Sequence, residues 1–204
     1  MHITLTAIIL FWSSVCALAQ TWKWGRGNTG SGIDAWSVAA DPSGNIFAAG
    51  INFGIYPVSL GSVTVPDGGS GSYKCIMAKY DPDGNVLWAV GTQNGDAQLY
   101  NIAADQFGNS FMFGAFKSAT IEIGDQVLTN PISPNAVCFL AKFKRGGSLD
   151  WVTTMGNGQW GYGTLGDIAT VLGTGNVATD AAGNMYITAN YHKAMINIGS
   201  HTFT

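Results

Sequence analysis

Repeated aspartates are the residues of this chain whose type and spacing point most directly to chemistry. The motif Asp-x-x-Gly-Asn occurs four times, and three of the copies begin at Asp41, Asp105 and Asp180. A fourth turn, Asp81-Pro-Asp83-Gly-Asn85, places two carboxylates and an amide within five residues. Calcium prefers oxygen ligands of this kind, so Asp81, Asp83 and Asn85 are candidates for a calcium site.

A hairpin turn is the competing interpretation of the same motif. Asp accepts hydrogen bonds from backbone amides, Pro presets φ, and Gly adopts the left-handed conformation that closes the turn. A calcium loop uses about six or more oxygens, including a distant bidentate carboxylate. Glu122 is the only Glu of the chain and lies far along the sequence. We therefore predict structural turns and no cofactor, with calcium as the alternative.

A glycine-rich stretch at residues 156–174 contains the best candidates for ligand contact, Trp160, Tyr162 and Asp167. It interrupts the spacing of the motifs and is long enough to project from a scaffold. Insertions within repeats commonly form loops on the binding face, and loops on rigid scaffolds often carry function. We predict a ligand-binding loop here, and a neutral insertion in a tolerant surface loop is the alternative.

The other candidates for catalysis have simpler explanations. His192 and His201 lie nine residues apart, with no Asp or Ser in a triad arrangement. Lys79 and Lys142 occupy one position of a repeat and are predicted to be solvated or to lie at a sheet edge. No phosphate loop, dinucleotide motif or nucleophile elbow is present. No catalytic residue is therefore assigned.

Three tryptophans, Trp24, Trp88 and Trp151, follow the hairpins at a fixed spacing. They are predicted to pack between repeats, with platforms for stacking sugars as the alternative. The formal net charge is −3 and only 10% of the residues are charged, so the chain offers no basic stripe for phosphates. This composition argues against nucleic-acid binding.

A repeated unit must position these motifs, because Ala78-Lys-Tyr80 and Ala141-Lys-Phe143 lie 63 residues apart. Each unit alternates apolar β-forming runs with Gly, Asn, Asp and Pro turns and shows no sustained helical period. An all-β repeat with one four-stranded antiparallel sheet per unit predicts the blade of a β-propeller. A solenoid is the alternative, whereas sandwich domains need about 100 residues each.

The spacing divides the chain into a signal peptide at 1–19 and a partial propeller at 20–204. The propeller comprises a closing strand at 20–26, repeat one at 35–91, repeat two at 99–156, the insertion at 156–174 and a partial repeat three at 175–204. About 2.5 blades are expected here, and propellers close with about 4–8. The remaining blades are therefore expected from a longer chain.

Three linked patterns carry a resemblance to a known family. They are Ser-x-Ala-x-Asp-x-x-Gly-Asn from Ser37, Ile-x-Ile-Gly from Ile121, and Phe-x-Ala-Lys from Phe139. Together they resemble the SBBP-type β-propeller repeat, over essentially all of the chain after residue 19. The chain departs from that pattern at Lys144-Arg-Gly-Gly and at the insertion. The resemblance implies a propeller scaffold of secreted and surface proteins of bacteria, and it implies no activity.

The first 19 residues predict export. An apolar run from Ile3 to Trp12 precedes Ala17-Leu-Ala19, which matches a Sec signal peptide cleaved after Ala19. The run is shorter than the roughly 20 apolar residues of a transmembrane helix, and no other segment qualifies. Lipidation at Cys16 is the alternative, although the residues before it match a lipobox poorly.

These features predict a secreted or surface-exposed propeller module that binds glycan or protein partners without catalysis. The alternative is a piece of a secreted propeller hydrolase or lyase whose active site is completed further along a longer chain. The repeated inward candidates, Ala39, Ala103 and Ala178, are small and apolar, which disfavours an enzyme. The longer chain could also carry a C-terminal sorting domain.

Overall fold

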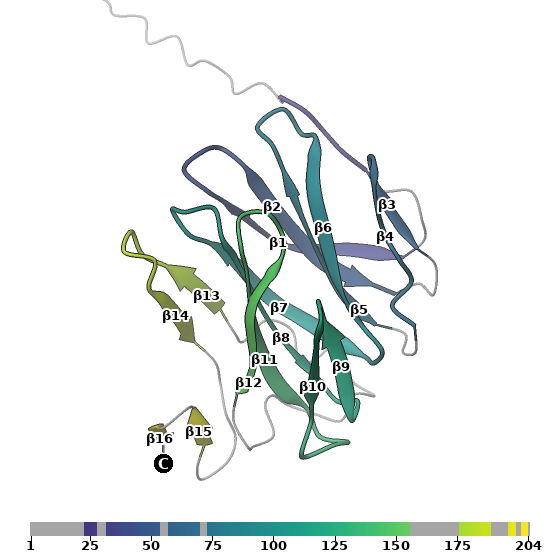
Figure 1. Cartoon of the computed structure of the whole chain (residues 1–204), viewed down its shortest axis with the longest axis vertical. Helices are drawn as coiled ribbons and strands as arrows, with labels where there is room; N and C mark the ends of the chain where they lie inside the picture. Colours follow the sequence, from purple (N-terminus) through teal and green to yellow (C-terminus); the bar gives the residue numbers. More distant parts are fainter. Residues whose placement is uncertain are drawn as a thin grey trace, which may run out of the picture.

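The computed structural model consists of β-strands and their connections (Figure 1). It describes residues 23–27, 32–53, 57–69, 73–155 and 176–188, together with the backbone of two further strands at 196–198 and 201–203. No helix occurs in these ranges, which confirms the predicted all-β class. In the same part of the chain there is thus no helix long and apolar enough to cross a membrane.

The strands follow the apolar runs that the turn motifs separate. In chain order they are β1 (Ile33–Ala40), β2 (Ile46–Asn52), β3 (Val58–Leu60), β4 (Val63–Val65), β5 (Lys74–Tyr80), β6 (Val86–Gln93), β7 (Ala97–Ala104), β8 (Ser110–Phe116), β9 (Thr120–Ile123), β10 (Gln126–Thr129), β11 (Val137–Phe143), β12 (Leu149–Met155), β13 (Asn176–Thr179), β14 (Met185–Thr188), β15 (Ile196–Ile198) and β16 (His201–Phe203).

Two antiparallel sheets dominate the fold. One has the order β1-β2-β5-β6-β9-β10, and the other has the order β12-β11-β8-β7. Within each, four long strands form a meander in chain order, and a short hairpin is inserted between the second and third strands. Both meanders carry a register shift in the first strand, at Ala35/Ser37 and at Leu99/Asn101. The local geometry of the two sheets is therefore matched in detail.

The inserted hairpin of repeat two joins the sheet of repeat one. In β9, Ile123 pairs with Thr92 of β6, and Glu122 pairs with Gln93. The sequence predicts one four-stranded sheet per unit, so this pairing between units is an addition that sequence reasoning did not anticipate. It ties the outer edge of one sheet to the next unit.

The first strands of successive units lie side by side, with β7 between β1 and β13. The Ser37 hydroxyl donates to Asn101 Oδ1 at 3.3 Å, and the Asn101 amide donates to Asn176 Oδ1 at 2.8 Å. These polar residues precede the predicted inward alanines by two positions in the same strands. A polar ladder therefore crosses three units beside these alanines.

The main core lies between the two large sheets. Phe47 and Met77 of one sheet and Met112 and Phe139 of the other are among its buried side chains. A smaller cluster joins the four-stranded sheet to β13 through residues such as Val177. Burial of these side chains supplies the main favourable term that holds the units together.

Candidate functional site

The residues first chosen for ligand contact, Trp160, Tyr162 and Asp167, lie outside the described residues. The same holds for residues 1–19, including Cys16, and for the side chains of His192 and His201. The predictions made for these positions therefore stay predictions. The closing strand at 20–26 also stays a prediction, and residues 23–27 carry no strand assignment.

In the fourth turn, at residues 81–85, the Asp81 carboxylate accepts hydrogen bonds from the turn itself. Asp81 Oδ1 accepts hydrogen bonds from the amides of Asp83 and Asn85 at 2.9 and 2.8 Å, and Asp81 Oδ2 accepts one from the Asn85 side chain at 2.9 Å. The bonds from Asn85 are the largest cause of a pKa of Asp81 below its usual value. Asp83 turns away and pairs with Lys23 at 3.0 Å.

The same three hydrogen bonds recur at Asp41, Asp105 and Asp180. The turn function predicted for this motif is therefore visible in every described copy. No group of three or more His, Cys, Asp or Glu residues converges within the described ranges. A calcium ion at Asp81 would compete with the amides that already occupy both carboxylate oxygens.

Lys79 corrects the expectation that this repeated lysine is solvated. Its side chain is 1% exposed, and its Nζ lies 3.3 Å from Asp41 Oδ2. The same Nζ donates to the Gly108 carbonyl at 3.2 Å and lies 4.7 Å from the centre of the Phe47 ring. The strand pattern gave no sign of this burial, because the partners come from the neighbouring turn and the next unit.

The ion pair keeps Asp41 charged in a buried place. Burial raises the pKa of Asp41, but hydrogen bonds from Asn45 and the contact with Lys79 outweigh it, so the pKa lies below its usual value. Lys142, the counterpart of Lys79 in repeat two, is 24% exposed and pairs with Asp150 at 3.5 Å. One repeat position therefore serves as a buried link in one unit and as a surface pair in the next.

Two of the repeated tryptophans pack between units, as predicted. Trp88 Nε1 donates to the Arg145 carbonyl at 3.0 Å, and a Cβ at Gly147 would lie 2.8 Å from the Trp88 ring. Trp24 Nε1 likewise donates to the Pro82 carbonyl at 3.2 Å. These rings are held against the turn of the following unit, which leaves them poorly placed to stack on a sugar.

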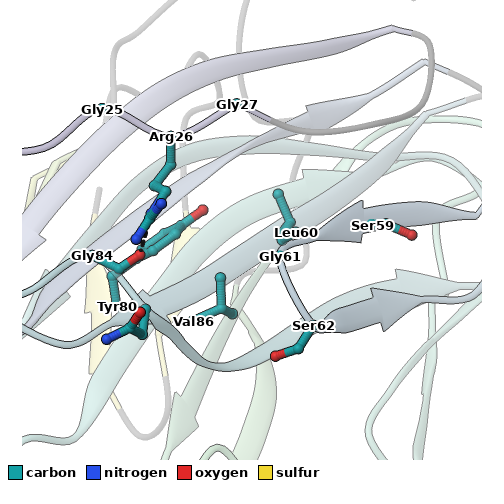
Figure 2. Close-up of a pocket in the computed structure, with 11 residues that line it drawn as sticks. Gly25, Arg26, Gly27, Ser59, Leu60, Gly61, Ser62, Tyr80, Gly84 and Val86 are labelled. Atoms are coloured by element: carbon teal, nitrogen blue, oxygen red, sulfur yellow. Dashed lines mark hydrogen bonds between the residues drawn. The ribbon is translucent and has the colours of Figure 1, made fainter.

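A pocket of about 590 Å³ lies between residues 25–27 and the β3–β4 hairpin (Figure 2). Glycine backbones form part of its wall, and the side chains that line it include Arg26, Ser59, Leu60, Ser62, Tyr80 and Val86. Arg26 Nε donates to the Gly84 carbonyl at 2.6 Å, which directs the guanidinium toward the Tyr80 ring (Figure 2). Arg26 is the one cation among the side chains that line this pocket.

Sequence reasoning missed this pocket because Arg26 belongs to no motif. The signal that could have found it is the comparison of repeats: Trp24 and Trp88 are 64 residues apart, so Arg26 corresponds to Val90. Repeat one has Val90 and repeat two has Thr153 at this position, so Arg26 places a charge where the two following copies have none. No family model matches this sequence, and a search of curated proteins finds no match.

Proposed function

We propose that this chain is a secreted or surface-exposed β-propeller module of the SBBP-type repeat, which binds glycan or protein partners without catalysing a reaction. The proposal rests on what the potentially reactive side chains contact in the folded chain. The carboxylates of the described Asp-x-x-Gly-Asn turns accept hydrogen bonds from their own turns, and Lys79 is buried in an ion pair. Groups that an enzyme would present to substrate here hold strands and sheets together.

The arrangement of sheets supports a propeller. Four-stranded antiparallel meanders follow each other along the chain, and their first strands lie side by side in the order β1, β7, β13. Propeller blades share this order, with first strands around the axis and outer edges protected by neighbouring structure. The β9–β10 hairpin on the edge of β6 provides such protection.

A rigid scaffold of this kind displays loops and clefts on which binding can vary. The insertion at 156–174, with Trp160, Tyr162 and Asp167, is the predicted binding loop. The pocket at Arg26 is a second candidate on the described part of the chain. Both places depart from the repeat, whereas the repeated residues themselves are engaged in packing.

A glycan array probed with the whole chain tests the binding function, with Trp160→Ala as the variant for the insertion. We expect binding to a restricted set of glycans and a loss of signal for Trp160→Ala. Unchanged binding by the variant would remove the insertion from the site. Release of reducing ends from a bound glycan would favour the hydrolase or lyase alternative instead.

Export is tested separately by expression in a bacterium with an active Sec pathway. Cleavage after Ala19 predicts a mature protein whose N-terminal residue is Gln20, which intact-mass measurement identifies. A mature chain that begins at a lipidated Cys16 would replace simple secretion by membrane anchoring.

A further inference from the structure

We infer that the pocket between residues 25–27 and the β3–β4 hairpin binds an acidic sugar residue of the hexuronate class. The inference rests on the proposed binding function and names its ligand chemistry. A hexuronate combines a carboxylate with a ring that has hydroxyl groups at its edge and apolar C–H groups on its faces. The pocket offers a matching group for each of these features.

Arg26 supplies the partner for the carboxylate. Among the described residues, its guanidinium makes one hydrogen bond, from Nε to the Gly84 carbonyl. The ion pairs of the described residues do not include Arg26, and the nearby Asp83 is already paired with Lys23. Within the described part of the chain neither terminal nitrogen of the guanidinium has a partner, so both can make a bidentate contact, the geometry in which guanidinium and carboxylate fit best.

The remaining lining suits the body of a sugar ring. Tyr80, whose ring also stacks on Trp24, lines the pocket beside the guanidinium, and Leu60 and Val86 contribute methyl groups (Figure 2). The Ser62 hydroxyl can donate and accept hydrogen bonds. The Ser59 hydroxyl also lines the pocket and shares a hydrogen bond of 3.1 Å with the Thr64 hydroxyl. A volume of about 590 Å³ falls within the range of roughly 300–1,000 Å³ for small-molecule sites.

The pocket is not a necessary product of the repeat. At the equivalent place in repeat two, Ile123 and Phe143 are each 1% exposed, and Leu149 packs onto the same core. The strand that corresponds to residues 25–27 carries Val90 in place of Arg26, and Val90 also packs against that core. The polar, open lining thus distinguishes repeat one from repeat two, as expected for a site rather than for scaffold.

The solvent exposure of Arg26 determines the affinity expected for a single hexuronate. Arg26 is exposed at the mouth of the pocket, so water competes with the ligand and the affinity for a single hexuronate should be weak. Charged hydrogen bonds of this kind favour the acid over its neutral counterpart by about fivefold to tenfold. That preference, rather than the absolute affinity, identifies the guanidinium as the recognition element.

Glycine-selective ¹⁵N labelling of the whole chain gives a local readout with an internal control. Gly27, Gly61 and Gly84 line the pocket. Their counterparts in repeat two are Gly91, Gly124 and Gly147. Titration with glucuronate is expected to shift the three pocket amides and to leave their counterparts in place. Titration with glucose should shift the same amides at about fivefold to tenfold higher concentration.

Arg26→Gln tests the assignment, and Arg145→Gln is the matched control because it removes one positive charge from an exposed turn of repeat two. Arg26→Gln should abolish the preference for glucuronate over glucose, and Arg145→Gln should preserve it. Pocket amides that do not move, a preference that survives Arg26→Gln, or equal shifts with sulfate alone would each overturn the inference. A positive glycan array with unmoved pocket amides would leave the proposed function standing and remove this site.

Discussion

The surroundings of the β3–β4 hairpin in repeat one and of the β9–β10 hairpin in repeat two share their backbone turns but differ in their side chains. In repeat two, β9 pairs with β6 and Ile123, Phe143 and Leu149 fill the space beneath. In repeat one, Leu60, Tyr80 and Val86 occupy the equivalent positions and a pocket of about 590 Å³ remains. The comparison shows that hydrogen-bonded turns set the backbone of the unit. The volume and polarity of a few side chains decide whether the space beside its inserted hairpin is filled or remains a pocket.

The repeated lysine shows the opposite difference, because it is more deeply buried in repeat one than in repeat two. Lys79 of repeat one is buried against Asp41, while Lys142 of repeat two remains at the surface with Asp150. Neither repeat is simply the better packed of the two. Each combines a common backbone pattern with its own links to the following unit.

Removal of the buried lysine should give the largest difference between the repeats. Lys79→Met leaves Asp41 charged and buried without its partner, which costs about 3–5 kcal/mol of unfolding free energy. Lys142→Met removes a partly exposed pair and should cost no more than about 1 kcal/mol. Urea-induced unfolding followed by circular dichroism measures both values. Equal losses in the two variants would contradict a special role for the buried pair.

How well the sequence predicts each of these features depends on how far apart in the chain the interacting residues lie. The Asp81 turn was predictable because its donors and acceptors lie within five residues. The burial of Lys79 was not, because the Gly108 carbonyl that it contacts lies 29 residues away in the next unit. The all-β class was predictable from alternating apolar runs, but the pairing of β9 with β6 depends on how two units meet.

The pocket shows a second kind of limit. Arg26 is visible in the sequence as a departure from Val90, but a departure alone does not say whether the space around it is open. That depends on the combined size of Leu60, Tyr80 and Val86 and on the path of residues 25–27. Volumes summed over several elements are a property of the folded chain and not of any one motif.

The turn glycines should give the next largest effect. Gly147 has φ +90°, and a Cβ there would lie 2.8 Å from the Trp88 ring, which β6 holds in place. Gly147→Ala should therefore cost about 2–3 kcal/mol of unfolding free energy. Gly84→Ala should cost less, about 1–2 kcal/mol, because Trp24 lies in a segment without a strand assignment and can shift.

Gly146→Ala is the control for both turn glycines, because nothing lies within 4 Å of a Cβ at that position. Its unfolding free energy should stay within about 0.5 kcal/mol of the parent. Thermal and urea unfolding of the three variants rank them directly. A loss for Gly146→Ala as large as that for Gly147→Ala would show that the neighbouring tryptophan is irrelevant.

Conversion of the pocket into its counterpart tests the main comparison. Arg26→Val with Val86→Leu installs the residues of Val90 and Leu149 and adds apolar contact at the edge of repeat one. The unfolding free energy should rise by about 0.5–1 kcal/mol, and the shifts of the pocket glycines with glucuronate should disappear. The reverse change, Val90→Arg, should lower it by about 1–3 kcal/mol because Val90 packs against the core. Loss of stability in the first variant would indicate that Arg26 is structural.

Acidification should give the smallest difference between the repeats. It should weaken the turn at residues 81–85 and spare the equivalent turn at residues 144–148. The pKa of Asp81 in the folded chain lies below the ordinary 3.8, chiefly because Asn85 donates to it. The carboxylate therefore stabilises its turn above pH 3.8, and that contribution is lost as the pH falls through the folded-state pKa. Repeat two has Lys144 at this position and keeps the equivalent backbone bonds, from the Lys144 amide to Ser148 and from the Gly147 amide to Lys144.

An NMR titration below pH 4 can resolve this difference, because it follows individual amides. The amides of Asp83 and Asn85 donate to Asp81 and should move together with a midpoint below 3.8, whereas the Ser148 amide should not share that transition. Asp81→Asn should remove the transition from the amide of Asn85 while the backbone bond between residues 81 and 85 persists. A common transition at both turns would mean that the whole edge opens in acid, so that the two turns would not be independent.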